Sequence, residues 1–369
     1  HKPVIFRATS QWFCSVDDFK DDAVKAAEDV KWFPEWGKDR LQSMVKERAD
    51  WCISRQRKWG VPIPVVYCQD CGKEIIDNDI MMKVSKIFGE EGSDAWFAHD
   101  TEYFLPEGFK CPHCGSAKGF DKEKDIMDVW FDSGSSHAAV CARRKYLKVP
   151  ADVYLEGADQ YRGWFQSSLL TSVAGGHGAP YKQIITHGWT VDGEGKKMSK
   201  SLGNGIAPQE IISKYGADIL RLWVASADYH ADIRISPEIL KQISDNYRKL
   251  RNTARYCLSN LYDFDPDKDM VSNNELEELD KYALMKLDEV IKIARDAFEV
   301  YDYHTAAHSL HNFCVVEMSN FYFDVLKDRL YTSAPQSKTR RAAQTVLYKV
   351  LDALTLVLTP ILAFTADEI

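Results

Sequence analysis

The chain has 369 residues, of which 45% are hydrophobic and 28% are charged, and these values are ordinary for a globular protein. This length is sufficient for two domains, and no apolar run approaches the roughly 18 to 20 residues that span a bilayer. We therefore expect no membrane partner. The formal net charge of −8 argues against a surface that is basic all over and binds nucleic acid, so any contact with RNA would have to be made by local basic patches.

The cysteines and the two ends of the chain indicate where the protein is found and what is missing from it. Nine cysteines, five of them scattered singly, argue against a disulfide framework and for a reducing compartment, so we expect a cytoplasmic protein. The first residues carry no signal peptide and read as the middle of a strand. The last residues stop inside an apolar helical pattern. We expect the chain to be a fragment.

The first two thirds of the chain alternate short strands with helices. Residues 3–8 and 11–16 read as short strands, and residues 67–125 read as a small polar insert bracketed by cysteine pairs. Strand-like runs at residues 152–157 and 182–191 alternate with helical patterns at residues 162–175 and 208–227. This order predicts part of a parallel α/β sheet.

From about Ser236 the pattern becomes helical. Residues 235–264, 275–331 and 338–369 carry long helical patterns, which predict a helical bundle. The fold class is therefore α/β, with a small insert, followed by an all-α domain. The predicted domains are residues 1–66 with 126–235, the insert at residues 67–125, and the bundle at residues 236–369.

Four cysteines carry the strongest chemical signal in the insert. Cys68 and Cys71 form one CxxC pair, and Cys111 and Cys114 form a second pair after 39 intervening residues. A glycine follows each pair and permits a tight turn in which backbone N–H groups point at sulfur. Four thiolates suit a closed tetrahedral site for a structural Zn²⁺ ion. The alternatives are two unrelated thiol pairs or a redox CxxC.

A basic, glycine-rich loop is the second signal. Lys197 and Lys200 lie three residues apart between Gly193, Gly195 and Gly203. Two such lysines can clamp a triphosphate as charge builds on its leaving oxygens. From chemistry alone, the loop could equally contact some other phosphate or be an ordinary surface loop.

Several sequence strings resemble one enzyme family. Lys197-Met198-Ser199-Lys200-Ser201, followed by Leu-Gly-Asn, resembles the second signature of the class I aminoacyl-tRNA synthetases. LEGADQYRGWF at residues 155–165 resembles the isoleucine-specific members, whereas WFDSG at 130–134 and DWCISRQR at 50–57 are similar in the valine and leucine enzymes as well. The resemblance continues through residues 246–256 and 320–331, and so covers essentially the whole chain.

The resemblance implies an aminoacyl-adenylate site. Its binding residues would be Glu156, Gly157, Asp159, Gln160, Trp130, Trp164, His187 and Gly188. The carboxylates would bind the α-ammonium group and the ribose hydroxyls of the adenylate. The two tryptophans would form the walls of the pocket for the isoleucine side chain. Residues 197–201 would bind ATP with Mg²⁺, with Lys200 and less directly Lys197 as the catalytic cations. Without this resemblance, we would assign the two tryptophans to the hydrophobic core and His187 to a structural role.

The resemblance also implies an activity and shows what the chain lacks. The expected enzyme is an isoleucine–tRNA ligase that uses ATP to activate L-isoleucine as isoleucyl-adenylate and transfers the isoleucyl group to tRNA(Ile), and the parent protein is expected to be a monomer. None of the ten histidines makes the His-x-Gly-His tetrapeptide that the family needs, and the editing insert is absent. We expect the fragment alone to be inactive. The alternatives are a tRNA-binding module without catalysis and a valine- or leucine-specific relative.

Basic residues in the helical region offer a weaker signal. Arg248, Arg251 and Arg255 share one face of a predicted helix. They would contact tRNA or belong to an ordinary solvated face. His304, His308 and His311 also share a face, which we interpret as bundle surface rather than a metal site.

Overall fold

The computed structural model describes residues 3–199 and 202–369. It divides into two compact units, an N-terminal unit that ends at Thr186 and a C-terminal unit that begins at His187. Lys200 and Ser201 lie outside the described residues. Within the described ranges, no helix has both the length and the apolar character needed to cross a bilayer.

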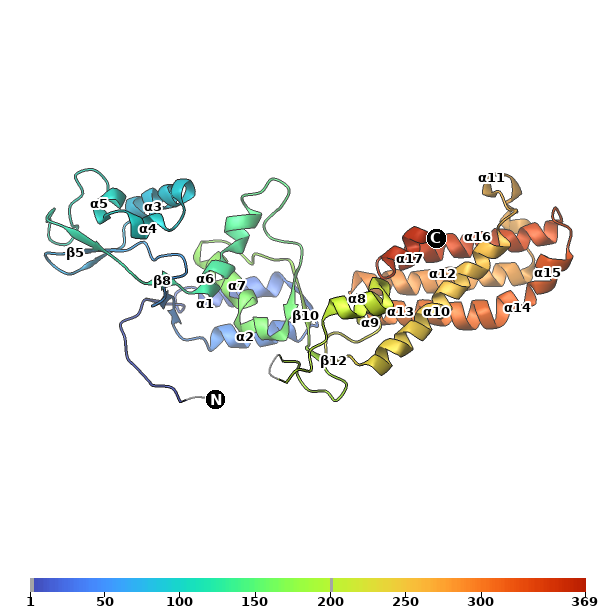
Figure 1. The fold of residues 1–369 in the computed structure, drawn as a ribbon. Coiled ribbons are helices and arrows are strands. Elements are labelled where there is room, and N and C mark those ends of the chain that lie inside the picture. The colour runs from blue at the N-terminus through green and yellow to red at the C-terminus, as the bar shows by residue number, and fades with distance from the viewer. Residues whose placement is uncertain (1–2, 200–201) are drawn as a thin grey trace. The chain divides into compact units, whose positions relative to one another are not determined.

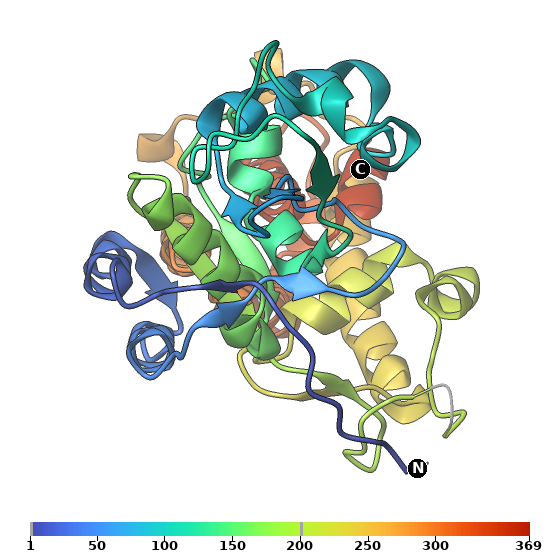
Figure 2. The same ribbon diagram turned by 90° about the vertical axis from the view of Figure 1, so that its left-hand side faces the viewer.

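A three-stranded sheet organises the N-terminal unit, and its middle strand, β10 (Gln183–His187), is labelled in Figure 1. Its order is β2 (Lys31–Phe33), β10 (Gln183–His187) and β9 (Tyr154–Gly157). Strand β10 runs parallel to β2, with Ile184 opposite Trp32. The helices of this region are α1 (Lys20–Ala26), α2 (Gly37–Lys46) and α7 (Trp164–Ala174). Helices α1 and α2 lie side by side in the blue segment of Figure 2.

The core of this region is built on α7, which is buried on nearly every side. Phe165, Leu169 and Leu170 are fully buried with Ile184 of β10. The same helix also buries four polar residues, Gln166, Ser167, Ser168 and Ser172. The sequence prediction of a strand, a helix and a second strand across residues 152–191 is confirmed by β9, α7 and β10.

The remaining elements of the N-terminal unit outside the insert are short. These are the 3₁₀ turn η1 (Ala27–Asp29), β1 (Phe13–Cys14) paired antiparallel with β3 (Trp51–Cys52), β4 (Ser54–Arg55) paired antiparallel with β8 (Ile126–Met127), α6 (Val129–Gly134), the π turn η2 (His137–Cys141) and the 3₁₀ turn η3 (Ala158–Arg162). The predicted strand at residues 3–8 is wrong. Ile5 and Phe6 are 94% and 99% exposed, and no strand among the described residues pairs with this segment.

The insert folds around a buried cluster of its own. Its sheet has β5 (Val66–Cys68) between β6 (Glu74–Ile75) and β7 (Phe120–Lys122), all antiparallel. Three helices cover it: α3 (Asn78–Glu91), α4 (Ala95–Ala98) and α5 (Thr101–Phe104). The cluster contains Val66, Trp96 and Phe104, together with Cys68 and Cys111.

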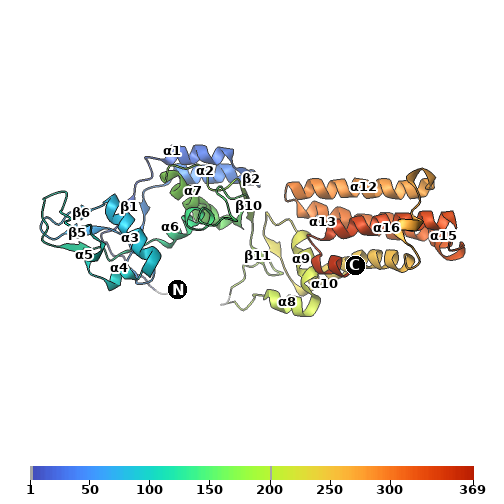
Figure 3. The same ribbon diagram turned by 90° about the horizontal axis from the view of Figure 1, so that it is seen from above.

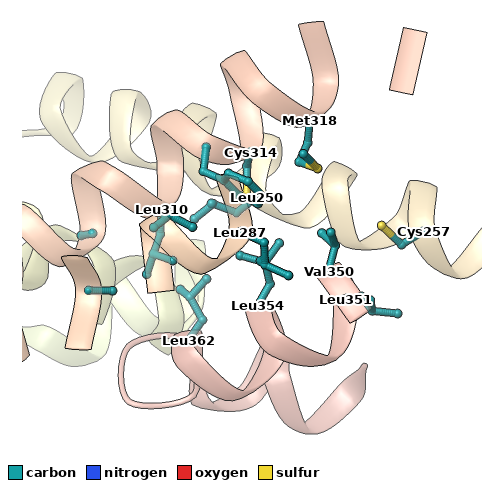
Figure 4. Close-up of a cluster of buried hydrophobic side chains, with 14 of the residues drawn as sticks. Leu250, Cys257, Leu287, Leu310, Cys314, Met318, Val350, Leu351, Leu354 and Leu362 are labelled. Atoms are coloured by element: carbon teal, nitrogen blue, oxygen red, sulfur yellow. The ribbon is translucent and has the colours of Figure 1, made fainter. Parts of the chain in front are cut away.

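The C-terminal unit is mainly helical (Figure 3). Its elements are β11 (Thr190–Val191) paired parallel with β12 (Ile233–Arg234), α8 (Pro208–Tyr215), α9 (Ala217–Ala225), α10 (Pro237–Asn260), α11 (Pro266–Asp269), the 3₁₀ turn η4 (Asn273–Glu275), α12 (Glu278–Glu299), α13 (Tyr303–Asn312), the π segment η5 (Phe313–Tyr322), α14 (Phe323–Val325), α15 (Lys327–Thr332), α16 (Lys338–Leu358) and α17 (Ala363–Glu368). The side chains of α10, α12, α13 and α16 point toward one another in a shared core, including Leu250, Leu287, Leu310 and Leu354 (Figure 4).

Two predicted helical runs are interrupted. The run at residues 208–227 breaks into α8 and α9 at Gly216, whose φ of 91° a helix cannot contain. The run at residues 275–331 breaks between α12 and α13, where Tyr301 has a φ of 60° and Asp302 caps α13 through the Thr305 amide.

The units do not divide at the predicted domain boundary of residues 235 and 236. Ile211, Leu222 and Ile235 belong to the same buried cluster as the bundle helices. The boundary between the two compact units lies between residues 186 and 187 of the sequence. The domain assignment made from the sequence remains a proposal.

Candidate functional sites

The four cysteines of the insert come together at one point. Their Sγ atoms all lie within 4.8 Å of one another, with 3.7 Å between Cys68 and Cys114 and 3.8 Å between Cys71 and Cys111. Cys68 and Cys111 are buried, whereas Cys71 and Cys114 are exposed. The two sequence pairs, 39 residues apart, therefore form one cluster that could hold a metal ion.

The local backbone explains why the cluster forms. The Gly72 amide donates to the Cys68 carbonyl and the Gly115 amide donates to the Cys111 carbonyl, each at 2.8 Å. Both glycines have φ near +70°, a conformation that strains other residues. Burial acts to raise the pKa of the Cys111 thiol, but the backbone amides of His113 and Cys114 outweigh it and lower this pKa to about 6. At Cys114 the backbone amide of Ser116 acts to lower the pKa, but burial and the neighbouring thiols outweigh it and raise this pKa to about 12. The turns thus favour a thiolate, the form that binds metal, at Cys111 first.

The predicted adenylate residues of the N-terminal unit gather where β9 ends and α7 begins. Gln160 accepts a hydrogen bond from the Trp164 amide at 2.9 Å and donates one to Asp159 at 2.9 Å. The carboxylates of Glu156 and Asp159 lie on exposed residues. The polar groups are therefore presented at the end of a strand that continues into a helix.

Trp130 and Trp164 lie close to this group. Trp164 stacks on Tyr154 with 3.9 Å between ring centroids, and its indole N–H donates to the Ser133 carbonyl at 3.0 Å. Gly163, which precedes Trp164, lies against the Trp130 ring, since a Cβ atom there would lie 2.9 Å from Trp130 Cη2. Trp130 remains 43% exposed, so its ring is available to a ligand. Their assignment to an isoleucine pocket remains a proposal.

A cavity of about 400 Å³ lies beside Trp130 and was not anticipated from the sequence. Asp128 in its wall accepts from Trp51 Nε1 at 3.0 Å and pairs with Arg55 at 3.1 Å. Burial first, and then the charge of Asp128, raise the pKa of Asp132 to about 6. The strings DVWFDSG and DWCISRQR contained these residues, but sequence spacing gave no sign that they would meet.

The basic signature lies in the C-terminal unit, on a hairpin that follows His187 and Gly188. Gly188 has no room for a side chain, because a Cβ atom would lie 2.4 Å from the Ala231 carbonyl. The His187 ring contacts the Gly188 carbonyl through Nδ1 at 2.7 Å. This contact suits a structural role for His187, and its place near a nucleotide remains a proposal.

Asp192 and Asn204 hold the hairpin closed, and neither was singled out from the sequence. Asp192 accepts from the Lys196 amide at 2.8 Å and from the Asn204 amide group at 2.9 Å. Asn204 in turn accepts from the Ser199 amide at 3.0 Å. The Asn204 and Lys196 hydrogen bonds lower the pKa of Asp192. These bonds fix the loop that carries the signature.

The signature residues differ in their surroundings. Lys197 Nζ lies 4.0 Å from the centroid of the Trp189 ring. Met198 packs against the buried cluster of the C-terminal unit, and the Ser199 hydroxyl accepts from the Leu202 amide at 3.2 Å. Only the part of the signature before residue 200 can be placed. The predicted adenylate residues thus divide between the two compact units.

The predicted tRNA-contacting arginines are exposed on α10. Arg248 pairs with Asp245 one turn earlier. Arg251 and Arg255 have no acidic partner within the described residues. Their contact with tRNA remains a proposal.

Comparison with known proteins places these sites in a family context. The family model "tRNA synthetases class I (I, L, M and V)" matches residues 2–236, and the model "Anticodon-binding domain of tRNA ligase" matches residues 280–369. The isoleucine–tRNA ligase of Caldanaerobacter subterraneus is 59% identical over 367 residues, which is 100% of this chain and 39% of that protein. The Caldicellulosiruptor bescii enzyme is 60% identical, over 100% of this chain and 40% of its own length.

Solved structures show the same fold. The methionyl-tRNA synthetase of Mycobacterium tuberculosis in complex with methionyl-adenylate gives a TM-score of 0.69 at 19% identity, covering 97% of this chain and 62% of that chain. The Agrobacterium radiobacter LeuRS in its ternary complex with tRNA and LeuAMS gives 0.62 at 20% identity, covering 87% and 41%. With more than half of its residues matched by the family model, the chain belongs to the class I tRNA synthetases of the I, L, M and V group.

Proposed function

We propose that this chain is part of an isoleucine–tRNA ligase. The protein would activate L-isoleucine with ATP to isoleucyl-adenylate and transfer the isoleucyl group to tRNA(Ile). The observation that carries the proposal is the 59–60% identity to curated isoleucine–tRNA ligases across the whole chain. The chain spans about two fifths of the length of those relatives, so the activity is proposed for the longer protein.

In the proposed reaction, a carboxylate oxygen of isoleucine attacks the α-phosphate of ATP, and pyrophosphate leaves. Lys200, with Lys197 in support, would neutralise the charge that develops on the phosphates, and Mg²⁺ bound to ATP would share this role. Glu156 and Asp159 would anchor the ammonium and ribose hydroxyl groups. Their exposed carboxylates at the end of β9 support this assignment.

The substrate side chain would lie between Trp130 and Trp164. Flat, rigid rings form a pocket that selects an apolar side chain by shape. The stacking of Trp164 on Tyr154, and its hydrogen bond to Ser133, support a fixed orientation for one wall. Arg251 and Arg255 on α10 would contact the tRNA backbone.

The cysteine cluster is proposed to hold one structural Zn²⁺ ion. A tetrahedral site with Zn–S distances of about 2.3 Å has sulfur atoms roughly 3.8 Å apart. The Cys68–Cys114 and Cys71–Cys111 Sγ–Sγ distances, 3.7 and 3.8 Å, agree with this value, and all four sulfur atoms lie within 4.8 Å of one another. His113 is not needed as a ligand, because its Nε2 contacts the Glu74 carbonyl. Four protein ligands leave no open position, so the metal would supply structure rather than catalysis.

The test is isoleucine-dependent ATP–pyrophosphate exchange by the full-length protein. Lys200→Ala should lower kcat far more than it raises the KM for isoleucine, because the charge it faces grows in the transition state. Lys196→Ala is the matched control, since the Lys196 ammonium is bound to Glu194 at 2.7 Å. An unchanged kcat for Lys200→Ala would contradict the assigned role.

The same assay separates the ligase from a tRNA-binding module without catalysis. The 369-residue chain alone should be slower than the full-length protein by on the order of 10²-fold or more, because it lacks the histidines that oppose the lysines. Recovery on mixing with a separately produced N-terminal half would support a divided active site. Activity with valine or leucine in place of isoleucine would favour the alternative that the protein is a valine- or leucine-specific member of the family.

A further inference from the structure

Two adjacent lysines on the signature hairpin have different partners. Lys196 Nζ forms an ion pair with Glu194 at 2.7 Å. Lys197 Nζ lies 4.0 Å above the centroid of the Trp189 ring, within the distance at which a cation is attracted to an aromatic face. A carboxylate neutralises the charge of its lysine, whereas an indole ring leaves the charge of Lys197 intact. Only the second arrangement preserves a full positive charge for an incoming phosphate.

The backbone holds Trp189 and Lys197 in register. Trp189 donates its amide to Asp232 at 2.8 Å, and its carbonyl accepts from the Ile233 amide at 2.8 Å. Lys197 is anchored on the other arm of the hairpin by an antiparallel bridge to Val191. Both ends of the contact are therefore tied to the β11–β12 pair, and the ring is placed before any ligand binds.

We infer that Trp189 is a positioning residue for Lys197. The ring fixes the ammonium at one point of the hairpin, so the flexible lysine stem has less conformational freedom to lose when the phosphates arrive. Trp189 is 42% exposed, so the ring lies at the surface of the C-terminal unit. This inference rests on the proposed function, because it needs Lys197 to act on ATP.

A double-mutant cycle in the full-length protein tests the inference by isoleucine-dependent ATP–pyrophosphate exchange. Trp189→Leu should lower kcat about two- to fivefold, the size of an exposed cation–π contact, with little change in the KM for isoleucine. Trp189→Phe and Trp189→Tyr should retain intermediate values of kcat. Trp189→Leu should have no further effect in a Lys197→Met background, because the partner is already gone.

The outcomes are distinguishable from failure of the proposed function. If Lys197→Met leaves kcat unchanged, the assigned role of Lys197 fails. If Lys197→Met lowers kcat but Trp189→Leu lowers it by the same factor in both backgrounds, Trp189 acts through the fold alone and the inference is overturned. If Trp189→Leu does not fold, the Trp189→Phe and Trp189→Tyr variants are used instead. The inference is overturned if both have the kcat of the wild type. It is also overturned if they lower kcat by the same factor in the Lys197→Met background.

Discussion

The insert, residues 67–125, and the helical bundle, residues 236–369, are built on cores of very different extent. The buried cluster of the insert is small, and two of its members are the thiols Cys68 and Cys111. The bundle has one large cluster that extends from Leu240 to Leu362 and also includes residues of α8 and α9, and largely buried ion pairs tie its segments together. A small hydrophobic core needs additional stabilisation, such as a bound metal ion. A large hydrophobic core is stable enough to offset the desolvation of buried charged groups.

The ion pairs of the bundle show how it uses polar residues. Asp280 is fully buried and accepts two hydrogen bonds from the Arg329 guanidinium, at 2.8 and 2.9 Å. Tyr322 donates to the same carboxylate at 2.7 Å. The pair joins α12 to α15 across 49 residues of sequence. No similarly buried acidic residue ties the described helices of the insert, which rely on apolar contacts and the thiols.

Removing the metal tests this contrast most strongly. Chelation, or Cys111→Ser, should unfold the insert and leave the bundle folded, because metal binding in small modules supplies on the order of ten kcal/mol of folding free energy. Hydrogen exchange should show lost protection in α3 and β5 and unchanged protection in α12 and α16. Cys141→Ser, outside the cluster, is the matched control.

Elemental analysis complements that experiment. One zinc per chain is expected in reduced protein that has not been exposed to chelator, and well under one in Cys111→Ser. An insert that keeps its protection without metal would contradict the stabilising role of the metal, and well under one zinc per chain in the wild-type protein would contradict the zinc assignment.

The next largest effect is expected in the bundle. Asp280→Asn should lower the free energy of unfolding by about 3 kcal/mol, because the largely buried Arg329 would lose its closest carboxylate and keep only the more exposed Glu277 at 3.5 Å. Asp328→Asn is the control, since that carboxylate is exposed, and it should change stability by less than about 0.5 kcal/mol. Urea unfolding followed by circular dichroism measures both. Equal effects would show that the buried pair contributes no more than a surface charge.

Acid sensitivity should be smaller and present in both regions. In the bundle, burial opposes ionisation of Asp263, but hydrogen bonds from Gln344 and Arg340 outweigh it and lower the pKa of Asp263. In the insert, burial likewise opposes ionisation of Glu123, and bonds from Trp12 and Tyr67 lower its pKa. A lowered pKa in the folded state means stability that is present above the unfolded pKa and lost as pH falls through the folded value.

The measurement compares each acid with its amide. The stability difference between wild type and Asp263→Asn should be about 1–2 kcal/mol near pH 7 and should shrink below about pH 4. Glu123→Gln should show the same trend in the insert. A difference that stays constant with pH would mean that the amide acts through packing rather than charge.

The sequence was informative where chemistry is local. The CxxC pairs with their glycines, the alternation of strand and helix over residues 152–191, and the long helical patterns all depend on neighbours within a few residues. The break at Gly216 and the strand expected at residues 3–8 were misread. Backbone conformation decided the first, and the second has no pairing partner among the described residues, which periodicity alone does not report.

The candidate sites show the same difference between local features, which the sequence predicts, and tertiary contacts, which it does not. The string at residues 197–201 predicted a phosphate loop, but not that Asp192 and Asn204 close it or that Lys197 lies on Trp189. Asp128 and Arg55 meet across 73 positions of sequence at the cavity beside Trp130. Such contacts depend on the tertiary fold, and residue spacing carries no record of them.

The smallest predicted effect comes from a matched pair of helix caps, one in each region. Asp77 caps α3 of the insert by accepting from the Ile80 amide at 3.0 Å, and Ser236 caps α10 of the bundle by accepting from the Ile239 amide at 3.3 Å. Replacing either with alanine should cost about 1 kcal/mol, because one amide of the first turn loses its partner. Asp77→Asn and Ser236→Thr keep an acceptor and are the controls.

The two caps should differ in their dependence on metal. Ser236→Ala should lower the stability of the bundle equally with and without chelator, since nothing in its core requires the metal. Asp77→Ala should lower the protection of the α3 amides only in metal-loaded protein, because the metal-free insert has already lost the helix that the cap would stabilise. Hydrogen exchange resolved to α3 and α10 separates the two cases. If Asp77→Ala costs the same after chelation, α3 survives without the metal, and the insert would have to be regarded as a self-sufficient core like the bundle.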